Sequence, residues 1–132
     1  MNDASLPGFS SYSSAIGIVM KRNEADHEVQ QVCCGALMNW ASIEFSFQND
    51  VSSYDFIEAI RDAMVYHNTD VVIQQHGCAA IMYLAENHKD SQATIARVGC
   101  ITSVVNAMNS QATNPKIQQL WLDCLCGFQQ GT

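Results

Sequence analysis

The chain has 132 residues, of which 48% are hydrophobic and 14% are charged, and thirteen Asp and Glu outweigh six Lys and Arg to give a net charge of −7. This length is enough for one domain with a substantial core. The negative charge opposes binding to phosphate backbones and to anionic membrane surfaces, so nucleic acid is excluded as an expected partner. No stretch approaches the roughly 20 uninterrupted apolar residues of a membrane-spanning helix, so we expect no direct membrane insertion.

Residues 1–10 contain Pro7 and Gly8 and predict an N-terminal extension without a helix. They lack the basic and apolar regions of a secretory signal, so we expect the chain to be intracellular. The six cysteines are spread through helical patterns rather than gathered in a short, loop-rich framework. This distribution is typical of a reducing compartment.

Two helices are predicted next, over residues 11–22 and 29–41. Asp26 precedes the second helix and is a strong N-cap, because its side-chain oxygen accepts hydrogen bonds from the free N–H groups of the first turn. Apolar residues recur along residues 29–41 with a helical period, which predicts one buried face. The predicted buried residues are Val29, Val32, Cys33, Ala36, Leu37 and Trp40.

The same pair of helices is predicted again over residues 54–67 and 73–85, with Asp70 as the N-cap of the second. The connecting residues 45–51 form helices poorly, and we expect a loop or a single turn there.

The last part of the chain begins with a short predicted helix, residues 91–98, which ends at Gly99. Glycine at this position lets the chain turn sharply into the next helix, residues 99–110. A further helix is predicted over residues 117–128, with Asn114 as its N-cap. Pro115 then occupies the first helical position, where its missing N–H costs nothing.

The long helices repeat one pattern, in which a β-branched residue is followed by two glutamines, at residues 29–31, 73–75 and 117–119. The copies are 44 residues apart, and the three N-caps keep the same spacing. Self-similarity at a fixed period of this length is the signature of a solenoid. We therefore expect one all-α domain over residues 1–132, with repeats at about 11–45, 46–88 and 89–128, the first of which lacks its short opening helix.

These residues resemble the armadillo repeat family. Residues 93–105 are similar to the armadillo opening, in which an alanine-rich helix ends at Gly99 before an apolar second helix. Residues 29–41 are similar to the third armadillo helix. The resemblance extends over residues 11–128 and implies a right-handed α-solenoid of three-helix repeats. HEAT repeats, which have two helices, are the neighbouring alternative.

The resemblance also implies that the third helices lie on the concave side of the solenoid and bind extended peptides or protein partners. In nuclear-import receptors this helix carries a Trp and, four residues later, an Asn that binds the peptide backbone. The Trp positions correspond here to Gly35, Ala79 and Asp123. The Asn positions correspond to Asn39, Tyr83 and Gly127. Only Asn39 matches, so we do not expect nuclear-import recognition.

Polar residues beside the predicted buried face are candidates for partner contacts, because amide and hydroxyl groups pair well with main-chain amides. They suit a neutral or basic partner segment, and the alternative is that they are only solvated. The predicted partner-binding residues are Gln31, Asn39, Gln75, Tyr83, Gln119 and Asp123.

The cysteines do not follow the paired spacing that structural zinc sites commonly show. Cys33 and Cys124 fall on the predicted buried face, so we interpret the cysteines as core residues, with Cys126 as the candidate for an exposed thiol. His76 and Cys78 are two residues apart and point in different directions on a helix, so we expect a half-buried packing histidine. We predict no catalytic site, no metal and no cofactor.

The sequence thus predicts a non-enzymatic protein–protein interaction module that binds a partner segment on the third-helix face. The alternative is a structural subunit or stabilising linker of a larger multi-protein assembly, held by neighbouring subunits through its ends and flanks. The truncated first repeat and the apolar last turn favour this alternative, because a solenoid needs polar caps at its ends.

Overall fold

The computed structural model describes residues 9–43, 55–87, 89–110, 113–115, 118–119 and 122. In this part of the chain the regular structure is entirely helical, which confirms the predicted all-α class. The helices are α1 (Phe9–Arg22), α2 (His27–Ala41), α3 (Asp55–Tyr66), α4 (Val71–Asn87), α5 (Lys89–Arg97) and α6 (Cys100–Ser110).

The predicted helices up to residue 110 are all confirmed, with ends that differ by at most two residues. Asp26 caps α2, because its Oδ1 accepts from the main-chain N–H groups of Glu28 and Val29 at 3.1 and 3.2 Å. Asp70 Oδ1 accepts from the N–H of Ile73 at 3.0 Å in the same way. Gly99 has a φ of 85°, a left-handed conformation that favours glycine, and separates α5 from α6 as predicted. The predicted loop at residues 45–51 and most of the helix predicted at 117–128 lie outside the described residues.

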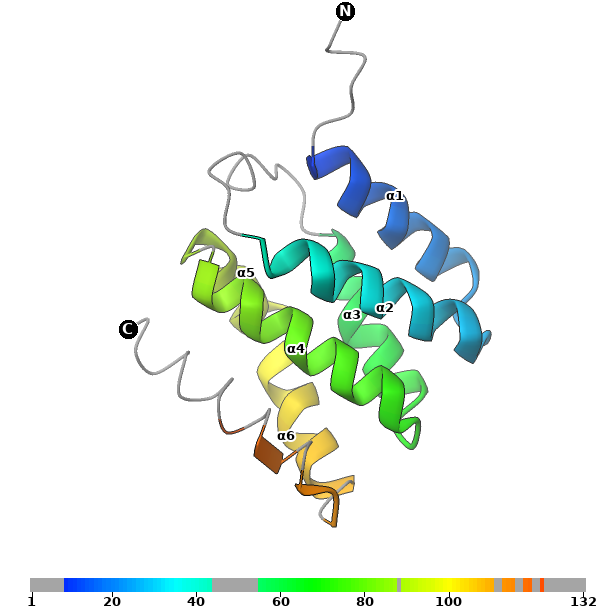
Figure 1. Cartoon of the computed structure of the whole chain (residues 1–132), viewed down its shortest axis with the longest axis vertical. Coiled ribbons are helices and arrows are strands. Elements are labelled where there is room, and N and C mark those ends of the chain that lie inside the picture. Colours follow the sequence, from blue (N-terminus) through cyan, green and yellow to red (C-terminus); the bar gives the residue numbers. More distant parts are fainter. Residues whose placement is uncertain are drawn as a thin grey trace, which may run out of the picture.

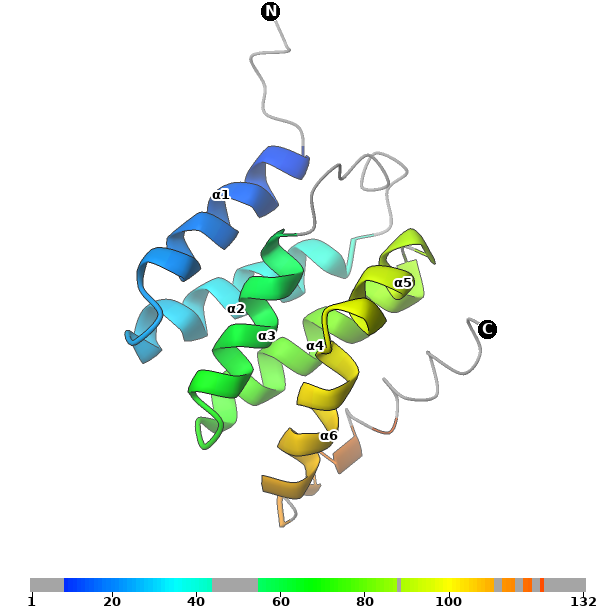
Figure 2. The same cartoon turned by 180° about the vertical axis from the view of Figure 1, so that it is seen from behind.

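The helices form two layers. In one layer α2 and α4 lie side by side, and in the other α1, α3 and α6 follow one another (Figures 1 and 2). The closest packing joins α2 to α4 and α1 to α3, and α5 packs against α4 and α6. Helices whose sequences are 44 residues apart are therefore neighbours in the same layer, so that successive helix pairs stack.

A single apolar core fills the space between the layers. Leu37, Ile60 and Ile81, from three different helices, are fully buried in it. Trp40 of α2 meets Phe56 of α3 edge to face, with ring centroids 5.5 Å apart and planes at 82°. Each large aliphatic side chain buried here stabilises the fold by about 1.5–3 kcal/mol.

The buried face of α2 differs from the predicted one. Val32 was predicted to be buried, but its side chain is 71% exposed, and Val29 and Ala36 are only half-buried. The residues that are buried instead include Gln30 and Cys34. The physical reason is that α2 packs on α4 along one flank, whereas no helix of the described chain covers the flank that carries Val32.

The first glutamine of each repeated pair ties one helix to the next. Gln30 Nε2 donates to the main-chain oxygens of Met20 and Asn23 at 3.0 and 2.7 Å. Gln74 Nε2 donates to the oxygens of Met64 and His67, both at 3.0 Å. The last carbonyls of a helix lack α-helical partners, and here the oxygens of Met20, Asn23 and His67 accept from main-chain N–H groups of the turn. The glutamine amide supplies a second donor to these oxygens. These glutamines therefore close the turn of each helix pair.

Candidate functional site

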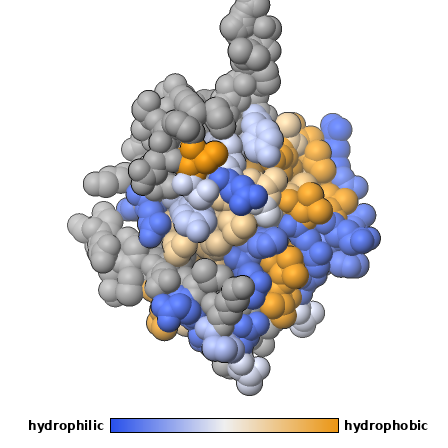
Figure 3. Space-filling model, viewed as in Figure 1, coloured by the Kyte–Doolittle hydropathy of each residue, from blue (hydrophilic) through white to orange (hydrophobic). Residues whose placement is uncertain are grey.

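The face formed by α2 and α4 is free of charged residues over much of its length. Residues 29–41 and 71–85 contain no Lys, Arg, Asp or Glu. Figure 3 shows this side of the molecule, where hydrophilic and hydrophobic side chains both reach the surface. The polar groups that this face can offer are therefore amides, a phenol hydroxyl and an imidazole.

Asn39, Gln75 and Tyr83, three of the predicted partner-binding residues, share this face. Asn39 lies exposed near the end of α2. Gln75 and Tyr83 on α4 are half-buried, and the ring of Tyr83 packs against the edge of the core. Asn39 and Tyr83 are 44 residues apart and occupy equivalent positions on neighbouring helices. The fold therefore brings an amide and a phenol onto adjacent helices of one layer.

Gln31 also lies at this face, but its amide is engaged within the chain. Its Nε2 donates to Oδ2 of Asp70 at 2.9 Å, while the other oxygen of Asp70 caps α4. Gln31 is half-buried and joins α2 to the start of α4. Of the two remaining predicted residues, Gln119 is exposed and Asp123 lies outside the described residues.

Glycine at position 35 makes room for His76. A Cβ built on Gly35 would lie 3.1 Å from His76 Nδ1, closer than most real contacts. The same ring nitrogen lies 3.3 Å from the main-chain oxygen of Gln31. His76 is half-buried, as predicted, and packs on α2 rather than beside Cys78, which is fully buried.

The four described cysteines, Cys33, Cys34, Cys78 and Cys100, are buried thiols outside any disulfide, which confirms the prediction that they are core residues. Burial raises the pKa of the Cys34 thiol to about 12, assisted by Cys33 and Asp70. Burial also raises the pKa of Cys100 to about 12, against an opposing contribution from Arg61. A thiol with such a pKa supplies almost no thiolate, the form that attacks substrates and binds metals.

Cys126, predicted as the exposed thiol, lies outside the described residues, as does Cys124. Among the residues whose placement is described, no three His, Cys, Asp or Glu side chains come together in a group that could hold a metal ion.

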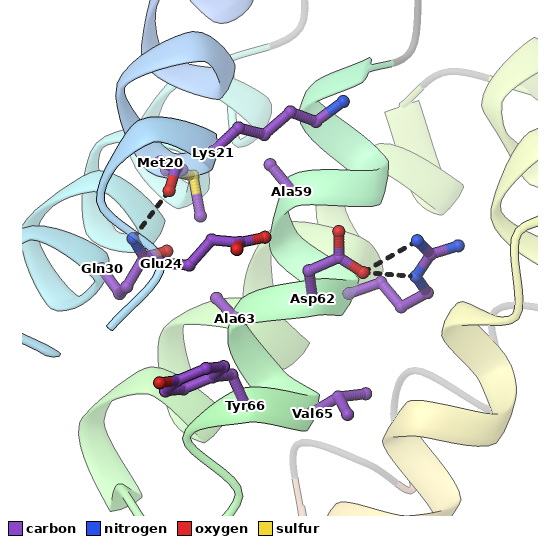
Figure 4. A pocket seen from close by; sticks show the side chains of 10 residues that line it. Met20, Lys21, Glu24, Gln30, Ala59, Asp62, Ala63, Val65 and Tyr66 are labelled. Carbon is purple, nitrogen blue, oxygen red and sulfur yellow. Dashed lines mark hydrogen bonds and ion pairs between the residues drawn. The ribbon is translucent and has the colours of Figure 1, made fainter. Parts of the chain in front are cut away.

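A cavity of about 460 Å³ lies between the end of α1 and the outer side of α3 (Figure 4). Met20, Ala59 and Ala63 form its apolar floor, and none of the six predicted partner-binding residues lines it. Its charged rim is largely paired: Lys21 Nζ lies 3.6 Å from Glu58, and Arg61 lies 2.8 Å from Asp62 and donates to the oxygen of Val98. Such exposed ion pairs stabilise little and position no reactive group.

The first glutamines of the repeated pairs hold this region together, and they were not among the predicted partner-binding residues. Gln30 and Gln74 adjoin the predicted residues Gln31 and Gln75, but they point into the core rather than to the open face. Both glutamines of each pair are identical in all three copies, so the repeat alone does not separate the buried Gln30 and Gln74 from the neighbouring glutamines at the open face.

Comparisons with known proteins found no relative of this chain: no family model matches it, and neither a curated protein nor a solved structure does. In the part of the chain that the structure describes, no helix has both the length and the apolar character needed to cross a membrane.

Proposed function

We propose that the chain is an armadillo-like, right-handed α-solenoid that acts as a non-enzymatic protein–protein interaction module, and that it binds a partner segment on the α2/α4 face. The observation that carries this proposal is the absence of charged residues from 29–41 and 71–85, on helices with one side open to solvent. The open face of a surface helix ordinarily carries charged residues. Their replacement by Gln, Asn, Tyr and His suits a surface that another chain covers, because buried charges are costly.

The chemistry of the α2/α4 face favours an extended segment of neutral or basic sequence. The Asn39 and Gln75 amides and the Tyr83 hydroxyl each combine a donor with an acceptor, as a peptide group does. Packed helices lie about 8–10 Å apart, and an extended chain rises about 3.3 Å per residue. Side chains on α2 and α4 would thus contact the partner at every third residue or so. The net charge of −7 would attract basic flanks of that segment.

A second candidate function is that of a structural subunit or stabilising linker in a multi-protein assembly. It is favoured by the exposure of Val32 and Tyr12, which are apolar or aromatic residues at the free flank of the first helix pair. Isolated exposed apolar residues are ordinary, but a group of them on one edge marks an interaction surface. In either case we infer an intracellular, reducing setting, since the described cysteines form no disulfide.

A photo-crosslinking residue placed at position 39 tests the proposed function. The matched control carries the same group in place of Tyr66, which is also exposed but lies on α3, in the other layer. We expect a specific crosslink to a partner protein from position 39 and none to that protein from position 66. Crosslinks to the same protein from position 66 alone would contradict binding on the α2/α4 face. Loss of the partner on replacing Val32, with no crosslink from position 39, would support the assembly subunit instead.

A further inference from the structure

The first helix pair (α1 and α2) packs against the second (α3 and α4), and we call such an interface between successive pairs a joint. This joint shows which groups contact the flank of a helix pair. Phe56 on α3 is completely buried, with the edge-on ring of Trp40 against it. It also lies so close to α1 that a Cβ built on Gly17 would be 3.2 Å from the Cα of Phe56. Tyr12 occupies the equivalent position 44 residues earlier and is 47% exposed. The aromatic residue at this repeat position is therefore buried in the second helix pair and exposed in the first.

The long helices show the same relationship. His76 of α4 packs into the space that Gly35 of α2 leaves for it. Val32, the equivalent of His76, is the most exposed of the large hydrophobic residues that the structure describes. On α1, Val19 is exposed, whereas its equivalent on α3, Ala63, is buried. We call Tyr12, Val19 and Val32 the α1/α2 edge.

Hydrogen bonding at the joint points to the same kind of neighbour. Asp70 uses Oδ1 to cap α4 and Oδ2 to accept from the amide of Gln31 in the preceding helix pair. Asp26 is the equivalent of Asp70, and its Oδ1 likewise caps α2. A helix pair stacked before α1 and α2 would therefore find the same carboxylate oxygen that Gln31 finds on Asp70.

The joints also show which partner fits. Gly17 faces the large Phe56 at the first joint. At the next joint the equivalent positions hold Arg61 and Cys100, and Cys100 Sγ lies 3.8 Å from the oxygen of Ile57. At each joint these two positions thus hold one small and one large residue. The position equivalent to Gly17 and Arg61 on α6 is Val105. A second copy stacked head to tail in this way would bring Val105 to Tyr12, two large residues at positions where each joint of this chain combines a large residue with a small one.

We propose that the α1/α2 edge docks a helix pair of a helical-repeat partner, which continues the stack of this chain. The partner presents a glycine or alanine opposite Tyr12, another small residue opposite Val32, and an amide side chain to Asp26. This surface adjoins the α2/α4 face, because Val32 and Asn39 are seven residues apart on one side of α2. Tyr12 and Asp26 belong to the α1/α2 edge alone, so the two proposals can still be tested apart.

The test supplies such a helix pair directly. A second copy of residues 11–54 is inserted before Ser11, which keeps the 44-residue register and brings copies of Gly17, Gly35 and Gln31 to the α1/α2 edge. Val32→Cys in the original helix reports on coverage of the edge through its rate of thiol alkylation, localised by mass spectrometry. Val65→Cys, on α3 away from the edge and nearly as exposed, is the matched control.

The inserted pair is expected to slow alkylation at position 32 at least roughly tenfold, as burial of an open site does, and to leave position 65 unchanged. Gly17→Val in the inserted copy alone should restore fast alkylation at position 32. Equal rates at position 32 with and without the insertion would overturn the proposal. So would alkylation of the unextended chain that slows as its concentration rises, because a second copy would then occupy the edge.

Discussion

The side-chain amide of Gln74 donates a 3.0 Å hydrogen bond to the main-chain oxygen of Met64, inside the core and ten residues upstream. Gln30 and Met20 make the same bond at the same separation. Gln118 donates to Met108 at 3.1 Å, again ten residues upstream. The repeated glutamine in the sequence thus corresponds to a repeated hydrogen bond in the structure, which fixes the angle between the two helices of each pair.

Gln74→Leu should destabilise the fold strongly. The substitution keeps the side-chain bulk but removes the buried amide that donates to the oxygens of Met64 and His67, although His67 keeps the N–H of Asp70. The expected loss in the free energy of unfolding is about 2–4 kcal/mol, measured by urea denaturation. Gln75→Leu changes the adjacent, half-buried glutamine and should alter stability by only about 0.5 kcal/mol. Equal losses for the two variants would contradict the role of the first glutamine.

Val32→Ala and Leu37→Ala should differ widely, although both residues were predicted to lie on one buried face. Leu37 is fully buried, so its truncation leaves a cavity and should cost about 2–5 kcal/mol. Val32 is mostly in solvent, and its truncation should change stability by about 0.5 kcal/mol or less. Thermal or urea unfolding of both variants checks this. A larger loss for Val32→Ala would place α2 in a different rotation.

Gly99→Ala should destabilise the turn between α5 and α6 through the backbone alone. No heavy atom lies within 4 Å of a Cβ built on Gly99, so the added methyl group meets no obstacle. At a φ of 85°, alanine should cost about 1–2 kcal/mol. Gly99→Asn should cost less, because asparagine tolerates the left-handed conformation better. If both variants unfold at the urea concentration of the parent chain, the described turn is wrong.

Stability should fall steeply at alkaline pH because of the buried thiols. The pKa of Cys34 and Cys100 is raised from 9.0 to about 12 in the folded chain. Below the unfolded pKa both states hold the proton, so the stability is fully present there. As the pH rises from 9.0 towards 12, the unfolded state releases protons that the folded state retains, and the stability is lost.

Each of these thiols should contribute a slope of about 1.4 kcal/mol per pH unit over that window. Urea denaturation at several alkaline pH values should show a shallower decline for Cys34→Ala than for the parent chain. The comparison is between slopes, because the substitution also removes packing. Parallel slopes would mean that Cys34 titrates normally in the fold.

The helices were predictable because their signals are local. Asp26, Asp70 and Gly99 act on N–H groups or dihedral angles within a few residues of themselves, and apolar periodicity does the rest. The rotation of α2 was not predictable in this way, since the burial of Val32 depends on whether a neighbour covers its flank. The burial of Gln30 was not predicted for a different reason. Glutamine is mostly an exposed residue, and Gln30 is buried because its amide donates to the carbonyls of Met20 and Asn23.

The candidate site was predictable in part. The register along each long helix puts Asn39 and Tyr83 at equivalent positions, and α2 and α4, which carry them, pack side by side in one layer. The hydrogen bond from Gln31 to Asp70 spans 39 residues and depends on how two helix pairs stack. The sequence of residues 29–41 alone therefore could not predict this hydrogen bond.

The affinity of the crosslinked partner for variants of the α2/α4 face tests the proposed function most directly. Asn39→Ala and Tyr83→Phe each remove a hydrogen-bonding group and should weaken binding about tenfold, which corresponds to about 1.4 kcal/mol. Tyr66→Ala, on the other layer, should bind as the parent chain does. Titration calorimetry gives the three values. Unchanged affinity for Asn39→Ala and Tyr83→Phe, with binding lost in Tyr66→Ala, would contradict the account.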